Sequence, residues 1–179
     1  MVTLKKLTRF FRHLLSNPWQ VTRHFSKASL QRIESAITAS ETKHTGEIRF
    51  VVEAGLHPFE TINGKTPRER GIELFSHLKI WDTELNNGVL IYLLLADRDV
   101  EIVADRGIDR HIGYDSWDMI CHDMEMLFRR GEFEAGVLQG IEEITAALEK
   151  HFPMDAVKNK RKKVIQRKKN ELSDKPLIL

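Results

Sequence analysis

Cysteine is almost absent from this sequence, and long apolar runs are missing as well. Cys121 is the single cysteine among 179 residues, so the chain cannot form an intramolecular disulfide or a zinc site that needs several thiolates. It falls near the apolar face of a predicted helix, where a buried structural thiol is the expected role. The longest apolar run, Val89 to Ala96, has the length of a strand and cannot span a bilayer, which takes about 20 residues.

The sequence also lacks the short motifs that mark common catalytic sites. It contains no GxSxG, no P-loop and no GxGxxG after a strand. The eight histidines are scattered, without the i, i+4 pairing of a zinc-binding helix. No continuous apolar segment with a cleavage site follows the basic N-terminus. We therefore expect a cytoplasmic protein without signal peptide or membrane anchor, with peripheral association with a membrane as the alternative.

Charge is distributed unevenly along the chain, although the net charge is only +2. Residues 1–25 carry a net charge of +5 and residues 156–179 a net charge of +7, so the 130 residues between them carry −10. This pattern predicts a basic amphipathic N-terminal arm over 1–25, an α/β domain over 26–155 and a basic flexible C-terminal tail over 156–179. The arms can bind an anionic partner, fold back onto the acidic body or remain solvated.

Basic residues in both arms are the predicted contacts to an anionic membrane surface. Apolar residues in 3–15 recur at helical spacing and form one stripe, with basic residues on the other face. Such a helix suits a membrane interface, and packing on the body or on a protein partner is the other interpretation. No aromatic residue interleaves with the basic tail, which disfavours nucleic acid. The predicted contacts are Lys5, Lys6, Arg9, Arg12, Arg161, Lys162 and Lys163.

Periodicity between the arms predicts alternating helices and strands. Strands are expected over 47–54, 88–96 and 100–105, and helices over 26–44 and 66–81, from residue 115 or 116 to about 130, and over 133–151. A helix between the first two strands makes them parallel through a right-handed crossover, and the short turn before the third strand makes it antiparallel. The predicted fold is a small mixed sheet with helices on both faces, an α/β/α sandwich.

This topology brings polar residues from distant parts of the sequence to one edge of the sheet. The first two strands would begin at the edge where the third strand ends, with the loop 82–87 beside them. Carboxylate and amide oxygens there suit calcium or magnesium, and Arg106 can hold a phosphate. The alternative is that these residues only form turns at strand ends. The predicted metal ligands are Glu47, Asp82, Asn87 and Asp105.

Three segments resemble the TPM domain family, which includes thylakoid acid phosphatase-like proteins and membrane-associated modulator proteins. They read GEIRFVVEA, RERGIELFSHLKIWDTELNNGVLIYLLLADRDVEIVADRGI and FRRGEFEAGVLQGIEEI, within about residues 26–153. The family pattern has an acidic residue just before the NGVL strand, where this chain has Asn86 and Asn87. It has a glycine-rich stretch after the third strand, where this chain has Asp105 and Arg106.

Two functions follow as hypotheses. The resemblance, together with the polar sheet edge, suggests a phosphatase-like hydrolase that binds calcium or magnesium. Asp105 and Arg106, which the topology places at that edge, are its predicted catalytic residues. The resemblance equally implies a noncatalytic module, which would use the basic N-terminal helix and tail to bind a membrane surface or an assembly partner.

Overall fold

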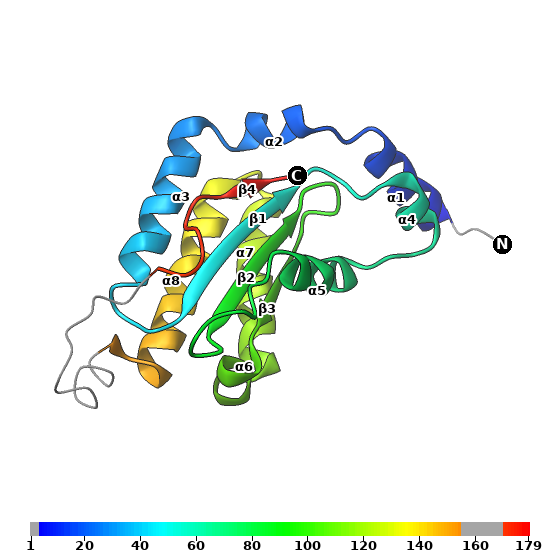
Figure 1. Ribbon diagram of the computed structural model, residues 1–179. Coiled ribbons are helices and arrows are strands. Elements are labelled where there is room, and N and C mark those ends of the chain that lie inside the picture. The colour runs from blue at the N-terminus through cyan, green and yellow to red at the C-terminus, as the bar shows by residue number, and fades with distance from the viewer. Residues whose placement is uncertain (1–3, 155–169) are drawn as a thin grey trace.

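The computed structural model describes residues 4–154 and 170–179, which form a mixed four-stranded sheet between helices (Figure 1). The strands lie in the order β3-β2-β1-β4. β1 and β2 are parallel, with Glu47 opposite Gly88, whereas β3 runs antiparallel to β2. The predicted parallel pair and antiparallel hairpin strand are therefore confirmed. The strand bounds are β1 Glu47–Glu53, β2 Gly88–Leu94, β3 Asp99–Ala104 and β4 Leu177–Ile178.

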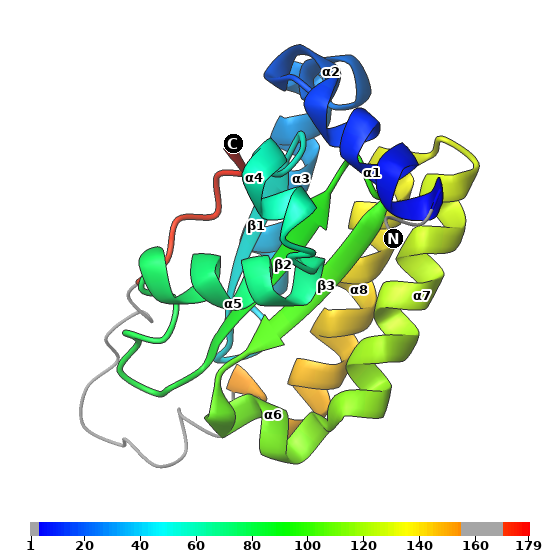
Figure 2. The same cartoon turned by 90° about the vertical axis from the view of Figure 1, so that its right-hand side faces the viewer.

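Helices cover both faces of the sheet, which confirms the predicted α/β/α sandwich (Figure 2). The larger core lies between the sheet and α3, α7 and α8, and a smaller core lies under α5. Every residue of β2 is buried, as its uninterrupted apolar run requires of a central strand covered on both sides. The bounds of these helices are α3 Lys27–Ser40, α5 Pro67–His77, α7 Tyr114–Arg129 and α8 Phe133–His151.

Side-chain caps fix the start of two of these helices where the sequence predicts them. Ser26 accepts a hydrogen bond from the Ser29 N–H at 3.1 Å and begins α3. Thr66 accepts from the Glu69 N–H at 3.1 Å, and the Glu69 carboxylate accepts from the Thr66 N–H at 2.8 Å. This reciprocal capping box satisfies two backbone donors that would otherwise lack a partner at the helix end.

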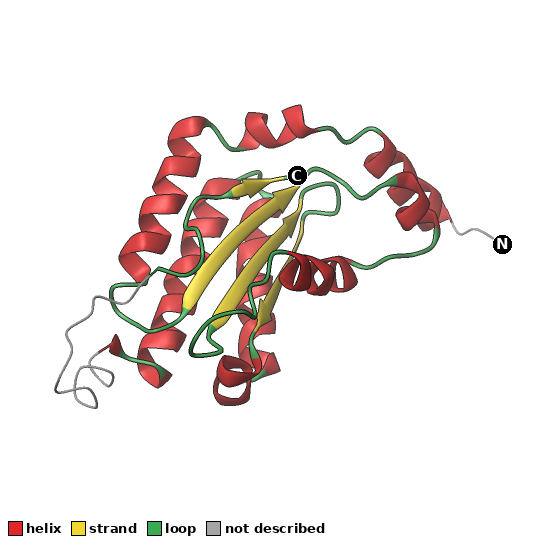
Figure 3. Ribbon diagram, viewed as in Figure 1, coloured by secondary structure: helices red, strands yellow, loops and turns green. Residues whose placement is uncertain are grey.

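Four short elements were not predicted (Figure 3). Each helix among them has seven residues or fewer, which is too short for apolar periodicity to show in a window of 11 or more. β4 has two residues and is recognisable only by its pairing with β1. The elements are α2 Pro18–His24, α4 Pro58–Ile62, α6 Arg106–Ile112 and β4.

The N-terminal arm belongs to the fold. α1 (Leu4–Leu14) packs against α4 beyond the end of the sheet (Figure 1). Val21 and Phe25 are buried in the larger core, so the packed domain begins before residue 26, the start that the charge pattern predicts. No helix among the described residues has the length and apolar character needed to cross a membrane.

The C-terminal residues 170–179, which we call the strap, run along the outer edge of β1 (Figure 1). β4 lies in this segment and pairs parallel to β1, with Leu177 opposite Val51 and Ile178 opposite Val52. Residues 170–179 of the predicted tail therefore run beside the sheet and pair with it through β4. The remaining tail residues, including Arg161, Lys162 and Lys163, lie outside the described residues.

Candidate functional site

The edge where β1 and β2 begin, which we call the rim, brings together residues that are distant in sequence. The Glu47 N–H donates to the Asn87 carbonyl at 3.0 Å, and the Asp105 N–H donates to the Gly88 carbonyl at 2.9 Å. A Cβ at Gly107 would overlap the carbonyl oxygen of Asn86, so the first turn of α6 lies directly against this loop. The predicted chain directions therefore place Glu47, Asn87 and Asp105 at one rim.

Two side-chain oxygens at the rim are buried without a hydrogen bond to any residue that the structure describes. Asn87 is 3% exposed; its amide nitrogen donates to the Thr45 carbonyl, whereas its Oδ1 finds no partner among the described residues. The Oδ2 of Asp105 is likewise buried without a partner there. A buried oxygen without a donor costs about 1–3 kcal/mol. A bound cation would remove that cost at each oxygen that it reached.

Glu47 is fully buried, and its carboxylate is already in use. Its Oε2 accepts hydrogen bonds from the backbone N–H groups of Glu171 and Leu172, both at 3.2 Å. These two residues begin the strap. The C-terminal segment of the chain therefore reaches the rim and contacts one of the predicted metal ligands.

Asp82 and Arg106 lie in the same region, but both are exposed. The Asp82 N–H donates to the Lys79 carbonyl within its turn, and no described contact joins its carboxylate to Glu47 or Asp105. Within residues 4–154 and 170–179, no three His, Cys, Asp or Glu side chains are grouped to hold a metal. A cation at the rim would therefore depend on the Asn87 amide oxygen and on few carboxylates. The ligand role of Asp82 and the phosphate contact of Arg106 stay predictions.

The predicted anion contacts of α1 are divided between the protein body and solvent. Arg9 and Arg12 bind the two carboxylate oxygens of Asp97 at 2.9 and 3.3 Å, and the buried His13 lies 3.1 Å from the same carboxylate. Burial alone would raise the pKa of Asp97, but His13 and Arg9 outweigh it and lower that pKa. Lys6 is exposed on the same helix as Lys5. Arg9 and Arg12 therefore face the body at Asp97, whereas Lys6 is exposed to solvent.

The far end of β1 carries a buried ion pair. Arg70 of α5 holds both carboxylate oxygens of Glu53, at 3.0 and 2.9 Å, and the Tyr92 hydroxyl donates to the same carboxylate at 2.7 Å. Burial, together with the Glu53 charge, raises the pKa of Tyr92, so its hydroxyl remains a donor. All three groups satisfy one another, and this cluster ties α5 to the two central strands.

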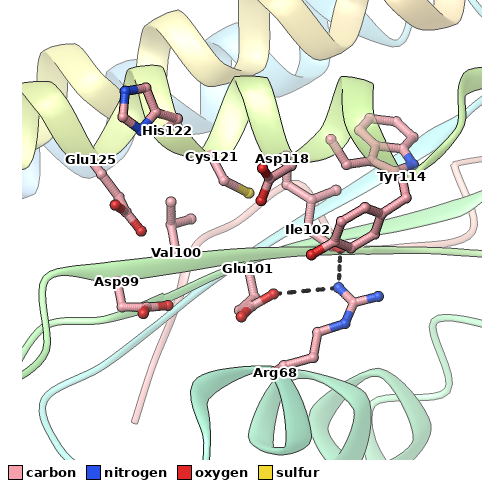
Figure 4. Close-up of a pocket in the computed structure, with 11 residues that line it drawn as sticks. Arg68, Asp99, Val100, Glu101, Ile102, Tyr114, Asp118, Cys121, His122 and Glu125 are labelled. Carbon is pink, nitrogen blue, oxygen red and sulfur yellow. Dashed lines mark hydrogen bonds and ion pairs between the residues drawn. The ribbon is translucent and has the colours of Figure 1, made fainter.

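An acidic hollow of about 260 Å³ lies along β3, between the start of α5 and α7 (Figure 4). Arg68 crosses it, donating to the Ile102 carbonyl at 2.5 Å and lying 3.5 Å from the Glu101 carboxylate. Burial and the nearby Glu101 and Glu125 raise the pKa of Asp99 to about 7. Burial also raises the pKa of Cys121 to about 12, which keeps it a thiol and favours the structural role expected of it.

Sequence reasoning missed the partners of the rim and of α1. Asp97 sits in the hairpin turn between β2 and β3, yet it anchors Arg9, which is 88 residues away. No local pattern signals such a pairing. Likewise, nothing in the spacing of the tail indicates that the backbone of Glu171 and Leu172 meets Glu47.

The fold and rim together define an α/β/α domain with buried oxygen donors where its parallel strands begin. The chain belongs to the TPM domain family, whose model matches residues 21–147. It is similar to the BA42 protein of Bizionia argentinensis, at 28% identity and a TM-score of 0.71 over 87% of this chain and 95% of that one. The N-terminal domain of a P. gingivalis protein shares the fold, at 20% identity and a TM-score of 0.59 over 72% of this chain and 78% of that one. No curated protein matches the sequence.

Proposed function

We propose that this TPM domain binds a divalent cation at the rim and acts there as a phosphatase-like hydrolase. The observation that supports it is the pair of buried oxygens, Asn87 Oδ1 and Asp105 Oδ2, without hydrogen-bond partners in the described chain. Oxygen donors of this kind suit calcium and magnesium. Glu47 supplies a further carboxylate, and Asp82 a more distant one in the adjoining loop.

Arg106 would contact the substrate. It follows Asp105 directly and is exposed at the start of α6, where a guanidinium can hold two phosphate oxygens at once. A divalent cation supplies charge that polarises a phosphoryl oxygen. Asp105 and Arg106 would thus act side by side, the first on the cation and the second on the phosphate.

The test of this proposal is a titration of the purified protein with Ca²⁺, Mg²⁺ and Mn²⁺, followed by calorimetry and thermal shift. Asp105→Asn keeps the shape of the side chain but removes its charge, so binding should weaken at least about tenfold. Asp115→Asn, an exposed carboxylate in the first turn of α7, is the matched control and should bind as the native protein does. Absence of binding at millimolar cation would refute the proposal.

Hydrolysis of p-nitrophenyl phosphate tests the reaction itself. Activity should require the cation and disappear in Asp105→Asn. Arg106→Lys should raise KM more than it lowers kcat, because lysine keeps the charge but cannot bind phosphate bidentately. Cation binding without any hydrolysis would leave a binding module and exclude the enzyme.

A second candidate function is binding to an anionic membrane surface from the cytoplasmic side. The orientation of α1 supports this function, because Arg9 and Arg12 face Asp97 and the apolar stripe of the helix is exposed to solvent. Leu4 is 80% exposed and Trp19, at the start of α2, is 68% exposed. Exposed Lys6 and Arg23 lie in the same arm and complement acidic headgroups. The other large exposed apolar residues of this region are Leu7, Phe11, Leu14, Leu15, Phe59 and Ile62.

Co-sedimentation with phosphatidylserine vesicles and with phosphatidylcholine vesicles tests this second function. Phe11→Glu should abolish binding to the anionic vesicles, because it places a charge in the middle of the stripe. Met119→Glu is the matched control, since Met119 is equally apolar and 68% exposed but lies on α7. Equal binding by both variants, or no binding by the native protein, would contradict a membrane role for α1.

A further inference from the structure

α1 turns its polar side, and not its apolar side, toward the protein body. The Leu56 N–H donates to His13 Nδ1 at 2.9 Å, and Arg9 donates to the Asp97 carboxylate at 2.9 Å. Arg9 and His13 lie one helical turn apart, so the face that they share is fixed to the body. The apolar stripe lies on the opposite side of the helix, where Phe11 is exposed at its middle. A helix that packs on a core has the reverse orientation, so the stripe is available to another apolar partner.

α4 extends this apolar surface. It packs against α1, and Figure 2 shows the two helices next to each other. Its Phe59 and Ile62 side chains are 68% and 66% exposed. A capping box between His57 and Glu60 fixes the start of α4, so both side chains are presented by an ordered turn of helix. Exposed apolar residues gathered on neighbouring helices mark a surface that binds a partner or a membrane.

α1 lies at the end of the sheet that is opposite to the rim. Leu56 follows the end of β1, and Asp97 follows the end of β2, so both contacts of α1 are made beyond the carboxyl ends of these strands (Figure 1). Both strands begin at the rim, and a strand of seven residues spans about 20 Å. An interfacial helix enters a bilayer by only about 5–10 Å. A bilayer bound to α1 would therefore not reach the rim.

Charge and aromatic content suit an anionic bilayer as the partner of this surface. Residues 1–25 carry a net charge of +5, which acidic headgroups attract. Trp19, exposed at the start of α2, has the amphipathic ring that is enriched at the boundary between lipid and water. At the other end of the sheet, Asp82 and Glu84 are exposed near the rim, and an anionic surface repels them.

We propose that the domain docks on an anionic bilayer through a composite surface of α1, α2 and α4, with its rim directed away from the lipid. This inference rests on the proposed membrane binding and adds α4 and the orientation to it. The rim then opens to the aqueous phase, so a molecule that binds there arrives from water or on another protein. The opposite orientation would bring the rim to the lipid through the basic residues 158–169, which directly precede the strap.

Tryptophan quenching by brominated lipid tests the orientation. Trp81→Phe leaves Trp19 on the docking surface, whereas Trp19→Phe leaves Trp81, which is exposed and follows Ile80 at the rim end. Both variants keep the buried Trp117 of α7. On phosphatidylserine vesicles with brominated acyl chains, Trp81→Phe should lose roughly half of its emission, because one of its two tryptophans lies at the acyl chains. Trp19→Phe should emit as it does on vesicles without bromine.

Co-sedimentation with the same vesicles tests the contribution of α4. Ile62→Glu should weaken binding roughly tenfold or more, because it places a charge in the docking surface. Leu85→Glu is the matched control, since Leu85 is an exposed apolar residue in the loop near the rim, and it should bind as the native protein does. Circular dichroism confirms that each variant is folded.

The outcomes separate the orientation from membrane binding itself. Quenching of Trp81, or equal affinity of Ile62→Glu and Leu85→Glu, overturns the composite surface and its orientation while membrane binding stands. If the native protein binds neither anionic nor neutral vesicles, the proposed membrane binding is refuted, and this inference is refuted with it.

Discussion

Asp99 shows how a single residue can make stability depend on pH. It lies on β3 beside Glu101, and burial with these neighbouring carboxylates raises its pKa to about 7. An aspartate in an unfolded chain titrates near 3.9. The folded state therefore holds the proton more tightly, so this contribution to stability is complete below about pH 4 and is lost as pH rises through about 7.

We expect Asp99→Asn to stabilise the protein at pH 8 by about 1–3 kcal/mol and to change little at pH 4. Urea unfolding at both values, followed by circular dichroism, measures the difference. Asp115→Asn, at an exposed position on α7, should give the same pH profile as the native protein. If the native and Asp99→Asn curves run parallel from pH 4 to 8, the shifted pKa is wrong.

At the scale of the element, helix caps carry a measurable share of stability. Thr66→Ala removes the oxygen that accepts from the Glu69 N–H and should lower the free energy of unfolding by about 1 kcal/mol. Thr22→Ala is a suitable control, because the Thr22 hydroxyl only donates to the Trp19 carbonyl at an exposed site. Chemical denaturation of both variants checks this, and an equal loss in the two would argue against the capping box.

Elements with long apolar patterns could be predicted from the sequence, and short ones could not. The run in β2 required a covered central strand, and the lengths of the connections set the directions of β1, β2 and β3. The same reasoning placed Glu47, Asn87 and Asp105 at one rim. It could not place the strap, because two strand residues and a few backbone contacts leave no periodic pattern. It could not foresee that Arg9 would turn toward Asp97, because that pairing depends on tertiary packing alone.

At the scale of the whole molecule, both edges of the sheet are protected. On β3, Arg68 donates to the Ile102 carbonyl and α7 packs against the strand. On the other edge, the strap covers β1. An uncovered edge strand offers its backbone groups to other chains. Protection of β1 therefore comes from the last ten residues of the chain.

Truncation after residue 169 should expose the edge of β1 and cause self-association at micromolar concentration. Analytical ultracentrifugation of the truncated and full-length proteins over a concentration series measures this. The full-length chain should sediment at a constant rate across the series. A truncated protein that stays monomeric at every concentration would show that the strap is dispensable for guarding the edge.

Several hydrogen bonds that hold the strap are made to its backbone groups. Arg49 holds the carbonyls of Ser173 and Lys175, so single substitutions at these two residues should be tolerated, whereas Glu171 and Asp174 also bind through their side chains. The number of residues is a different matter, because the segment must reach Glu47 at one end while Leu177 and Ile178 stay opposite Val51 and Val52. One inserted residue would shift the pairing register by one, so each of these two side chains would point to the other face of the sheet. Natural variants should therefore preserve the length of the strap more strictly than its amino-acid sequence.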